Sequence, residues 1–114
     1  MNYTAAAETH QQQTTNNQQQ TTNNQQMDLL ELQKIVKERY FETDNERGIY
    51  HTALWFHEEV GELSSAIASG DRENAKEEFA DVLMWLLTLA NLMEVDMEEA
   101  IAAYLNNPRK LPTK

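Results

Sequence analysis

The sequence predicts an all-α fold arranged as a four-helix bundle. Apolar residues recur at helical spacing along most of the chain after residue 27, and the period-two alternation that indicates strands is absent. The chain of 114 residues contains only three glycines and two prolines, so few positions would interrupt a helix. Together these observations predict one small helical domain.

The first helix is expected over residues 28–42, where apolar residues such as Leu32 and Val36 share one face. Residues 43–50 are expected to form the connection to the next helix. This stretch contains three residues that are common in turns, namely Asp44, Asn45 and Gly48.

The second and third helices are expected over 51–69 and 72–93, and they meet at a short turn. Gly70 suits the left-handed conformation that ends a helix, and Asp71 suits the cap of the next one. A turn this short makes the two helices antiparallel neighbours. The fourth helix is predicted from a capping box at its start and a proline after its end, at Asp96, Glu99 and Pro108.

Residues 1–26 differ sharply in composition from the rest of the chain. Gln, Asn and Thr make up 19 of these 26 residues. The septet QQQTTNN occurs twice in tandem, at 11–17 and 18–24, and offers no apolar position for a coiled-coil seam. Such a segment cannot bury enough apolar surface to offset the entropy of ordering. We therefore expect a disordered Gln/Asn/Thr-rich tail before a folded domain over 27–114.

The folded domain is small. Its 88 residues hold 18 of the 19 acidic residues and all nine basic residues of the chain. A domain of this size buries only a limited hydrophobic core. We therefore expect the bundle to be completed by oligomerisation, as a homodimer or a dimer of dimers.

The overall charge and composition exclude several classes of protein. A formal net charge of −10 argues against a nucleic-acid partner, because such a partner requires a basic face. No apolar run approaches the roughly 18 residues of a membrane span and no signal peptide is evident, so we expect no membrane partner and a cytoplasmic protein. The lack of cysteine excludes disulfides, Cys-based zinc sites and thiol nucleophiles.

Two pairs of acidic residues lie on corresponding sides of the second and third predicted helices. At about 100° per residue, Glu59 and Glu62 fall to one side of the apolar stripe of the second helix. Glu78 and Asp81 fall on the same side of the apolar stripe of the third helix. Because these helices form an antiparallel hairpin, both pairs are expected on one side of that hairpin.

The two pairs also match in height along the hairpin. Glu62 and Glu78 are each eight residues from Gly70, whereas Glu59 and Asp81 are each eleven residues from it. The two levels are separated by about 4.5 Å, which is three residues at the helical rise. Four carboxylates are thus expected to converge.

Converging carboxylates repel one another unless they are solvated, protonated or bridged by a cation. Mg²⁺ prefers oxygen ligands and commonly joins protein carboxylates to substrate phosphates. No histidine or cysteine accompanies the four acids at a spacing that would favour zinc. The pattern therefore predicts a Mg²⁺ site, and the alternative is a solvated acidic helix face.

The acidic motifs resemble those of the MazG-like nucleotide pyrophosphohydrolases, which belong to the all-α NTP pyrophosphatase superfamily. The sequence is EEVGEL at 58–63 and EEFADVL at 77–83, which fits the family pattern E-E-x-x-E … E-x-x-D. The resemblance extends over essentially all of residues 27–105. It identifies the metal-binding acids with Glu59, Glu62, Glu78 and Asp81.

The resemblance implies a Mg²⁺-dependent enzyme that cleaves nucleoside triphosphates into monophosphate and pyrophosphate. The clearing of non-standard nucleotides is the role expected from it. One of these four carboxylates is expected to take the proton from the attacking water. The sequence does not indicate which one.

Five further residues are expected to contact the substrate. Trp55 and Trp85 lie one helical turn from the acids and could stack on a nucleobase, or could instead pack against a partner subunit or the first helix. Arg47, Arg109 and Lys110 are expected to contact phosphates, and the alternative for each is a solvated surface position.

The sequence departs from the family pattern at two places. Many relatives have a cysteine-containing tail after the last helix, which this chain lacks, and many have asparagine where this chain has Thr88. These departures keep open a second hypothesis, in which the protein is a catalytically inactive helical oligomer that binds nucleotide or a protein partner.

Overall fold

The computed structural model describes residues 27–107, which form four helices and contain no strand. The helices are α3 (Leu29–Arg47), α4 (Ile49–Ser69), α5 (Arg72–Leu92) and α6 (Met97–Asn106). The predicted all-α class is confirmed. None of these helices is long and apolar enough to cross a membrane. The tail predicted for residues 1–26 and the basic residues Arg109 and Lys110 lie outside the described residues.

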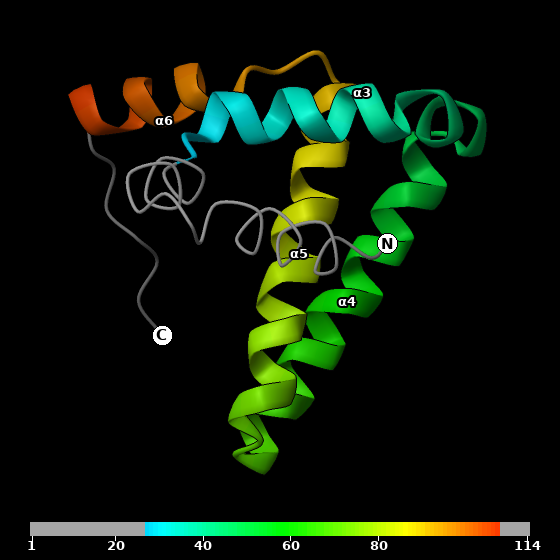
Figure 1. The fold of residues 1–114 in the computed structure, drawn as a ribbon, viewed down its shortest axis with the longest axis vertical. Helices are drawn as coiled ribbons and strands as arrows, with labels where there is room; N and C mark the ends of the chain where they lie inside the picture. Colours follow the sequence, from blue (N-terminus) through cyan, green and yellow to red (C-terminus); the bar gives the residue numbers. More distant parts are fainter. Residues whose placement is uncertain (1–26, 108–114) are drawn as a thin grey trace, which may run out of the picture.

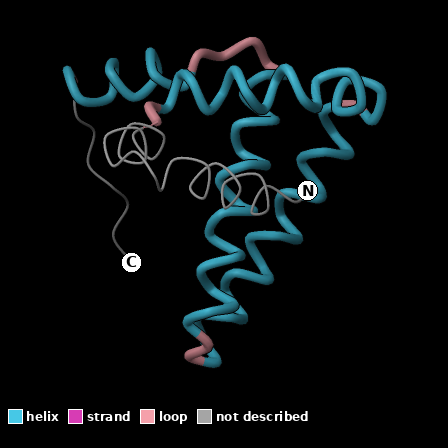
Figure 2. The backbone as a smooth tube through the Cα atoms, viewed as in Figure 1, coloured by secondary structure: helices cyan, strands magenta, loops and turns pink. Residues whose placement is uncertain are grey.

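A long antiparallel hairpin of α4 and α5 dominates the fold, and α3 lies across its open end (Figure 1). Helix α6 begins near the start of α3 and extends beyond it, away from the hairpin (Figure 1). Only short connections join the helices, and the turn at Gly70 and Asp71 closes the far end of the hairpin (Figure 2). Within residues 27–107, much of the length of α4 and α5 therefore contacts only the other helix of the hairpin.

The helix ends that close the hairpin and begin α6 are those expected from the sequence. Gly70 adopts the left-handed conformation, with φ 72° and ψ 17°, and ends α4. The Asp71 carboxylate accepts a 3.1 Å hydrogen bond from the Asn74 backbone N–H at the start of α5. The Asp96 carboxylate accepts an equivalent 3.1 Å bond from the Glu99 N–H at the start of α6.

The prediction that residues 43–50 form the connection between the first two helices is wrong. Helix α3 continues to Arg47, α4 begins at Ile49, and Gly48 alone stands between them. Gly48 can turn the chain within one residue because it has no Cβ, so its φ of 89° meets no steric clash. Asp44 remains helical because its carboxylate is buried and paired within α3, so it does not form a loop.

A buried polar network fixes α3 to the turn between α5 and α6. The Gln33 amide nitrogen donates to Asn91 Oδ1 at 3.0 Å and to the Val95 carbonyl at 2.7 Å. The Gln33 amide oxygen accepts from the Met97 backbone N–H at 2.9 Å. One side chain therefore satisfies groups at the end of α5 and the start of α6, which places α6 beside α3.

Five hydrophobic side chains among the described residues are buried, namely Val36, Ala66, Trp85, Leu87 and Ala90. Most of the apolar stripes of α4 and α5 are only half-buried or exposed. Ile67 and Phe79 are 57% and 58% exposed. We call the exposed part of these stripes the apolar face, and it consists of Val60, Ile67, Phe79, Leu83, Leu86 and Met93.

Candidate metal centre

Acidic side chains from α4 and α5 meet between the two helices. One carboxylate oxygen each from Glu59, Glu78 and Asp81 lies within 4.8 Å of the others. All three residues are half-buried. Glu59 belongs to α4, whereas Glu78 and Asp81 belong to α5. The structure therefore brings together Glu59 and Asp81, which are each eleven residues from Gly70, and Glu78, which is three residues nearer to it.

Glu62, the fourth predicted acid, is exposed at the edge of this group. Its charge raises the pKa of each of the other three carboxyl groups after the larger effect of burial. We call Glu59, Glu62, Glu78 and Asp81 the acid cluster. Three of its members are half-buried, and the fourth is exposed to solvent.

Burial within the acid cluster leaves two carboxylate oxygens without a hydrogen-bond donor. Glu59 Oε2 and Glu78 Oε2 are both inaccessible to solvent and have no partner among the described residues. A buried carboxylate oxygen that accepts no hydrogen bond is costly, since it has lost its water without replacement. A cation bound between these oxygens would remove that cost.

The same burial shifts the pKa values of the cluster. Desolvation, followed by the charges of Glu62, Asp81 and Glu78, raises the pKa of Glu59 from 4.5 to about 7. Desolvation is also the largest cause that raises the pKa of Glu78 and of Asp81. The metal-free protein therefore resists full ionisation of Glu59 at neutral pH.

The ligand set of the cluster consists of carboxylate oxygens alone. No histidine belongs to it in the part of the chain that the structure describes, and the chain has no cysteine. Hard cations that prefer oxygen ligands, such as Mg²⁺ and Ca²⁺, fit this set better than zinc does. The residues present therefore fit a divalent cation of this kind.

The two tryptophans lie in contact with each other, directly beside the acid cluster. The ring centroids of Trp55 and Trp85 are 5.8 Å apart in an edge-to-face arrangement. Trp85 is only 6% exposed, whereas Trp55 is half-buried. The pair thus packs across the interface between α4 and α5.

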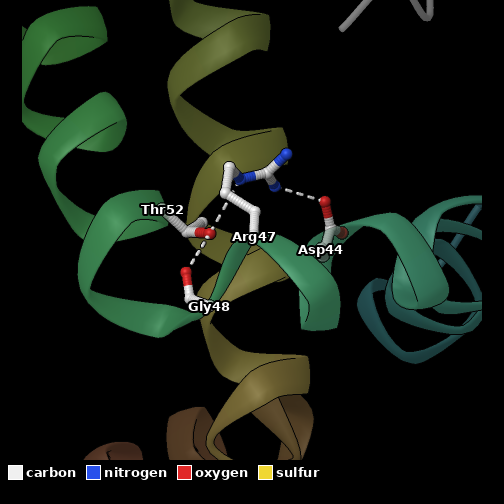
Figure 3. Close-up of polar contacts among 4 residues, drawn as sticks. All are labelled: Asp44, Arg47, Gly48 and Thr52. Carbon is white, nitrogen blue, oxygen red and sulfur yellow. Dashed lines mark hydrogen bonds and ion pairs between the residues drawn. The ribbon is translucent and has the colours of Figure 1, made fainter.

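Arg47 lies against both tryptophans at the end of α3. Its guanidinium carbon is 4.8 Å from the Trp55 ring centroid and 5.0 Å from that of Trp85. Arg47 Nε donates to Thr52 Oγ1 at 3.0 Å, and Nη2 forms an ion pair with the buried Asp44 carboxylate (Figure 3). The guanidinium therefore joins α3, α4 and α5.

Sequence reasoning missed Asp44 and Thr52 as partners of Arg47. The spacing of three residues between Asp44 and Arg47 is typical of an ion pair on one helix face, and it was the available signal. Nothing in the local pattern distinguishes Thr52, whose hydroxyl also donates to the Gly48 carbonyl at 2.8 Å. Thr88 is fully buried on α5, and its hydroxyl has no partner among the described residues.

Comparison with known protein families identifies the family to which the chain belongs. The model of the MazG nucleotide pyrophosphohydrolase domain matches residues 48–111. The chain belongs to the MazG family. The matched segment contains α4, α5 and α6 with all four members of the acid cluster, whereas α3 lies before it. No curated protein matches the chain.

The raised pKa of Glu59 predicts an unusual pH dependence for the metal-free MazG domain. Because the folded-state pKa of about 7 exceeds the ordinary 4.5, the folded state binds this proton more tightly than the unfolded state. The contribution of Glu59 to stability is therefore fully present below about pH 4.5 and is lost as pH rises through about 7. Thermal unfolding in the presence of a chelator is expected to give a lower Tm at pH 8 than at pH 5.5.

A matched pair of variants separates this effect from other titrations. Glu59→Gln is expected to flatten the dependence, whereas the exposed neighbour variant Glu58→Gln should keep the wild-type profile. An unchanged profile in Glu59→Gln would show that Glu59 does not carry the effect.

Proposed function

We propose that this MazG protein is a Mg²⁺-dependent nucleoside triphosphate pyrophosphohydrolase that releases a nucleoside monophosphate and pyrophosphate. The observation that carries the proposal is the convergence of Glu59, Glu78 and Asp81 within 4.8 Å, with two buried oxygens left unpartnered. The family match supports the reaction class. The clearing of non-standard nucleotides remains the role expected from the resemblance.

Within this proposal, the acid cluster holds Mg²⁺. Bound Mg²⁺ supplies charge neutralisation for the triphosphate and lowers the pKa of a coordinated water. Glu62 is the most accessible member and lies where a solvent-exposed phosphate would approach. A carboxylate of the cluster is also the proposed acceptor of the proton from the attacking water.

The other proposed substrate contacts rest on different observations. Trp55 is half-buried one helical turn before Glu59, so its ring is better placed than the buried Trp85 to meet a nucleobase. Arg109 and Lys110 lie outside the described residues and stay predictions from the sequence.

The enzyme proposal is tested with the full-length protein. Incubation with a panel of NTPs and dNTPs is expected to release pyrophosphate only when Mg²⁺ is present. Glu62→Gln should abolish both Mg²⁺ binding and turnover, because it removes a charged ligand without burying a new group. Glu58→Gln is the matched control and should retain the activity.

Two results would contradict the enzyme proposal. Full activity in Glu62→Gln would refute the assigned metal centre. Folded wild-type protein that releases no pyrophosphate from any substrate would instead favour the catalytically inactive helical oligomer.

We also propose that the protein is a homodimer formed through the apolar face. Large exposed apolar patches commonly mark interaction sites, and Ile67 and Phe79 of the apolar face are each more than half exposed. The face runs along both helices of an antiparallel hairpin, so a second copy related by a two-fold axis can present the same residues in return.

The dimer proposal predicts that a charge on the apolar face separates the subunits. Ile67→Glu is expected to reduce the mass measured by sedimentation or light scattering toward the 13.2 kDa of one chain. Thr43→Glu adds the same charge at an exposed position of α3 and should leave the assembly intact. A wild-type protein that sediments as one chain, or an Ile67→Glu variant that keeps the wild-type mass, would contradict the proposal.

A further inference from the structure

Arg47 is enclosed to an extent that is unusual for a residue at the end of a surface helix. Its side chain is only 13% exposed, and it is held by an ion pair to Asp44 and a hydrogen bond to Thr52 (Figure 3). Both indole rings of the chain also lie within about 5 Å of its guanidinium. The contacts of Arg47 thus come from α3, α4 and α5.

The tryptophans link Arg47 to the acid cluster through two helices. Trp55 lies four residues before Glu59 on α4, and Trp85 lies four residues after Asp81 on α5. Four residues of helix correspond to about 6 Å along the axis. The stack of Arg47 on the tryptophan pair is therefore the next layer of the α4–α5 interface above the acids.

This layer lies next to the part of the α4–α5 interface where carboxylate charges repel one another. The carboxylate oxygens of Glu59, Glu78 and Asp81 lie within 4.8 Å of one another, so these groups repel one another when they are ionised. That repulsion favours separation of α4 and α5 at this height. The edge-to-face contact between Trp55 and Trp85 opposes the separation, and the guanidinium packs on both rings at once.

We propose that Arg47 is a positioning residue of the metal centre, which fixes the separation of α4 and α5 so that the acid cluster is preformed for a divalent cation. This inference rests on the proposed function, because it assigns a role toward the metal. It differs from a phosphate contact, since Nε and Nη2 of Arg47 already donate to Thr52 and Asp44.

Arg47→Met provides a test in which the sign of the effect is informative. The variant removes a positive charge near a cation site, so a purely Coulombic role predicts tighter Mg²⁺ binding. Positioning predicts weaker binding, by about tenfold, as is typical when a residue that supports metal ligands is lost. A phosphate contact predicts unchanged Mg²⁺ affinity and a raised KM for the nucleotide.

The measurement is calorimetric titration of the full chain with Mg²⁺ alone at pH 8. Arg47→Lys is the second variant, and it should also weaken binding because lysine lacks the planar fork of donors with which Arg47 bonds to Thr52 and Asp44 at once. If Arg47→Met does not fold, Arg47→Lys carries the test. Asn91→Ala is the control, since it removes a buried polar contact at the other end of α3, away from the acid cluster.

The outcomes separate the two proposals. Weaker Mg²⁺ binding in the Arg47 variants, with wild-type affinity in Asn91→Ala, supports positioning. Unchanged or tighter binding in the Arg47 variants overturns it, as does an equal loss in Asn91→Ala. Absence of Mg²⁺ binding by the wild-type chain overturns the proposed metal centre itself.

Tryptophan fluorescence gives an independent readout. The chain has two tryptophans and both belong to the stack, so its emission reports on this layer alone. The wild-type emission is expected to change on Mg²⁺ addition because the acid cluster is one helical turn away. An emission that does not respond to saturating Mg²⁺ would contradict the coupling between the stack and the cluster.

Discussion

Electrostatic repulsion among the four members of the acid cluster is the constraint on which the rest of the structure depends. Water would screen these charges on an open helix face, but Glu59, Glu78 and Asp81 are half-buried between α4 and α5. The resulting cost appears as the raised pKa of Glu59 and as two carboxylate oxygens without partners. A fold that keeps such a cluster together must hold the two helices by contacts elsewhere.

Those contacts lie on either side of the acids. On one side, the single turn at Gly70 joins the helices, and Ala66 is buried close to it. On the other side, Trp55 and Trp85 pack together beneath the guanidinium of Arg47. The repulsive layer is thus enclosed by two attractive ones, which suits a site that gains stability when a cation enters.

The sequence predicted the features that depend on local rules. Gly70 and Asp71 defined the hairpin turn through their capping preferences, and the counts from Gly70 then set the relative heights of the acids. Because both quantities follow from helical geometry, the sequence predicted that four carboxylates converge, and Glu59, Glu78 and Asp81 lie within 4.8 Å of one another while Glu62 is exposed.

Features that depend on contacts between distant segments could not be derived in this way. The polar residues around Asp44 suggested a loop, whereas the ion pair with Arg47 keeps them helical and leaves Gly48 as the whole connection. Periodicity identified the apolar stripes but not what covers them. The stripes of α4 and α5 are largely exposed because α3 reaches only the open end of the hairpin.

We propose that the acid cluster binds Mg²⁺ and that Glu59 is partly protonated before the ion binds. Calorimetric titration with Mg²⁺ in two buffers of different ionisation enthalpy counts the protons released. With the pKa of Glu59 at about 7, about half a proton should leave this residue at pH 7, and the release should vanish near pH 9. Mg²⁺ binding without proton release at pH 7, or no binding at either pH, would contradict the account.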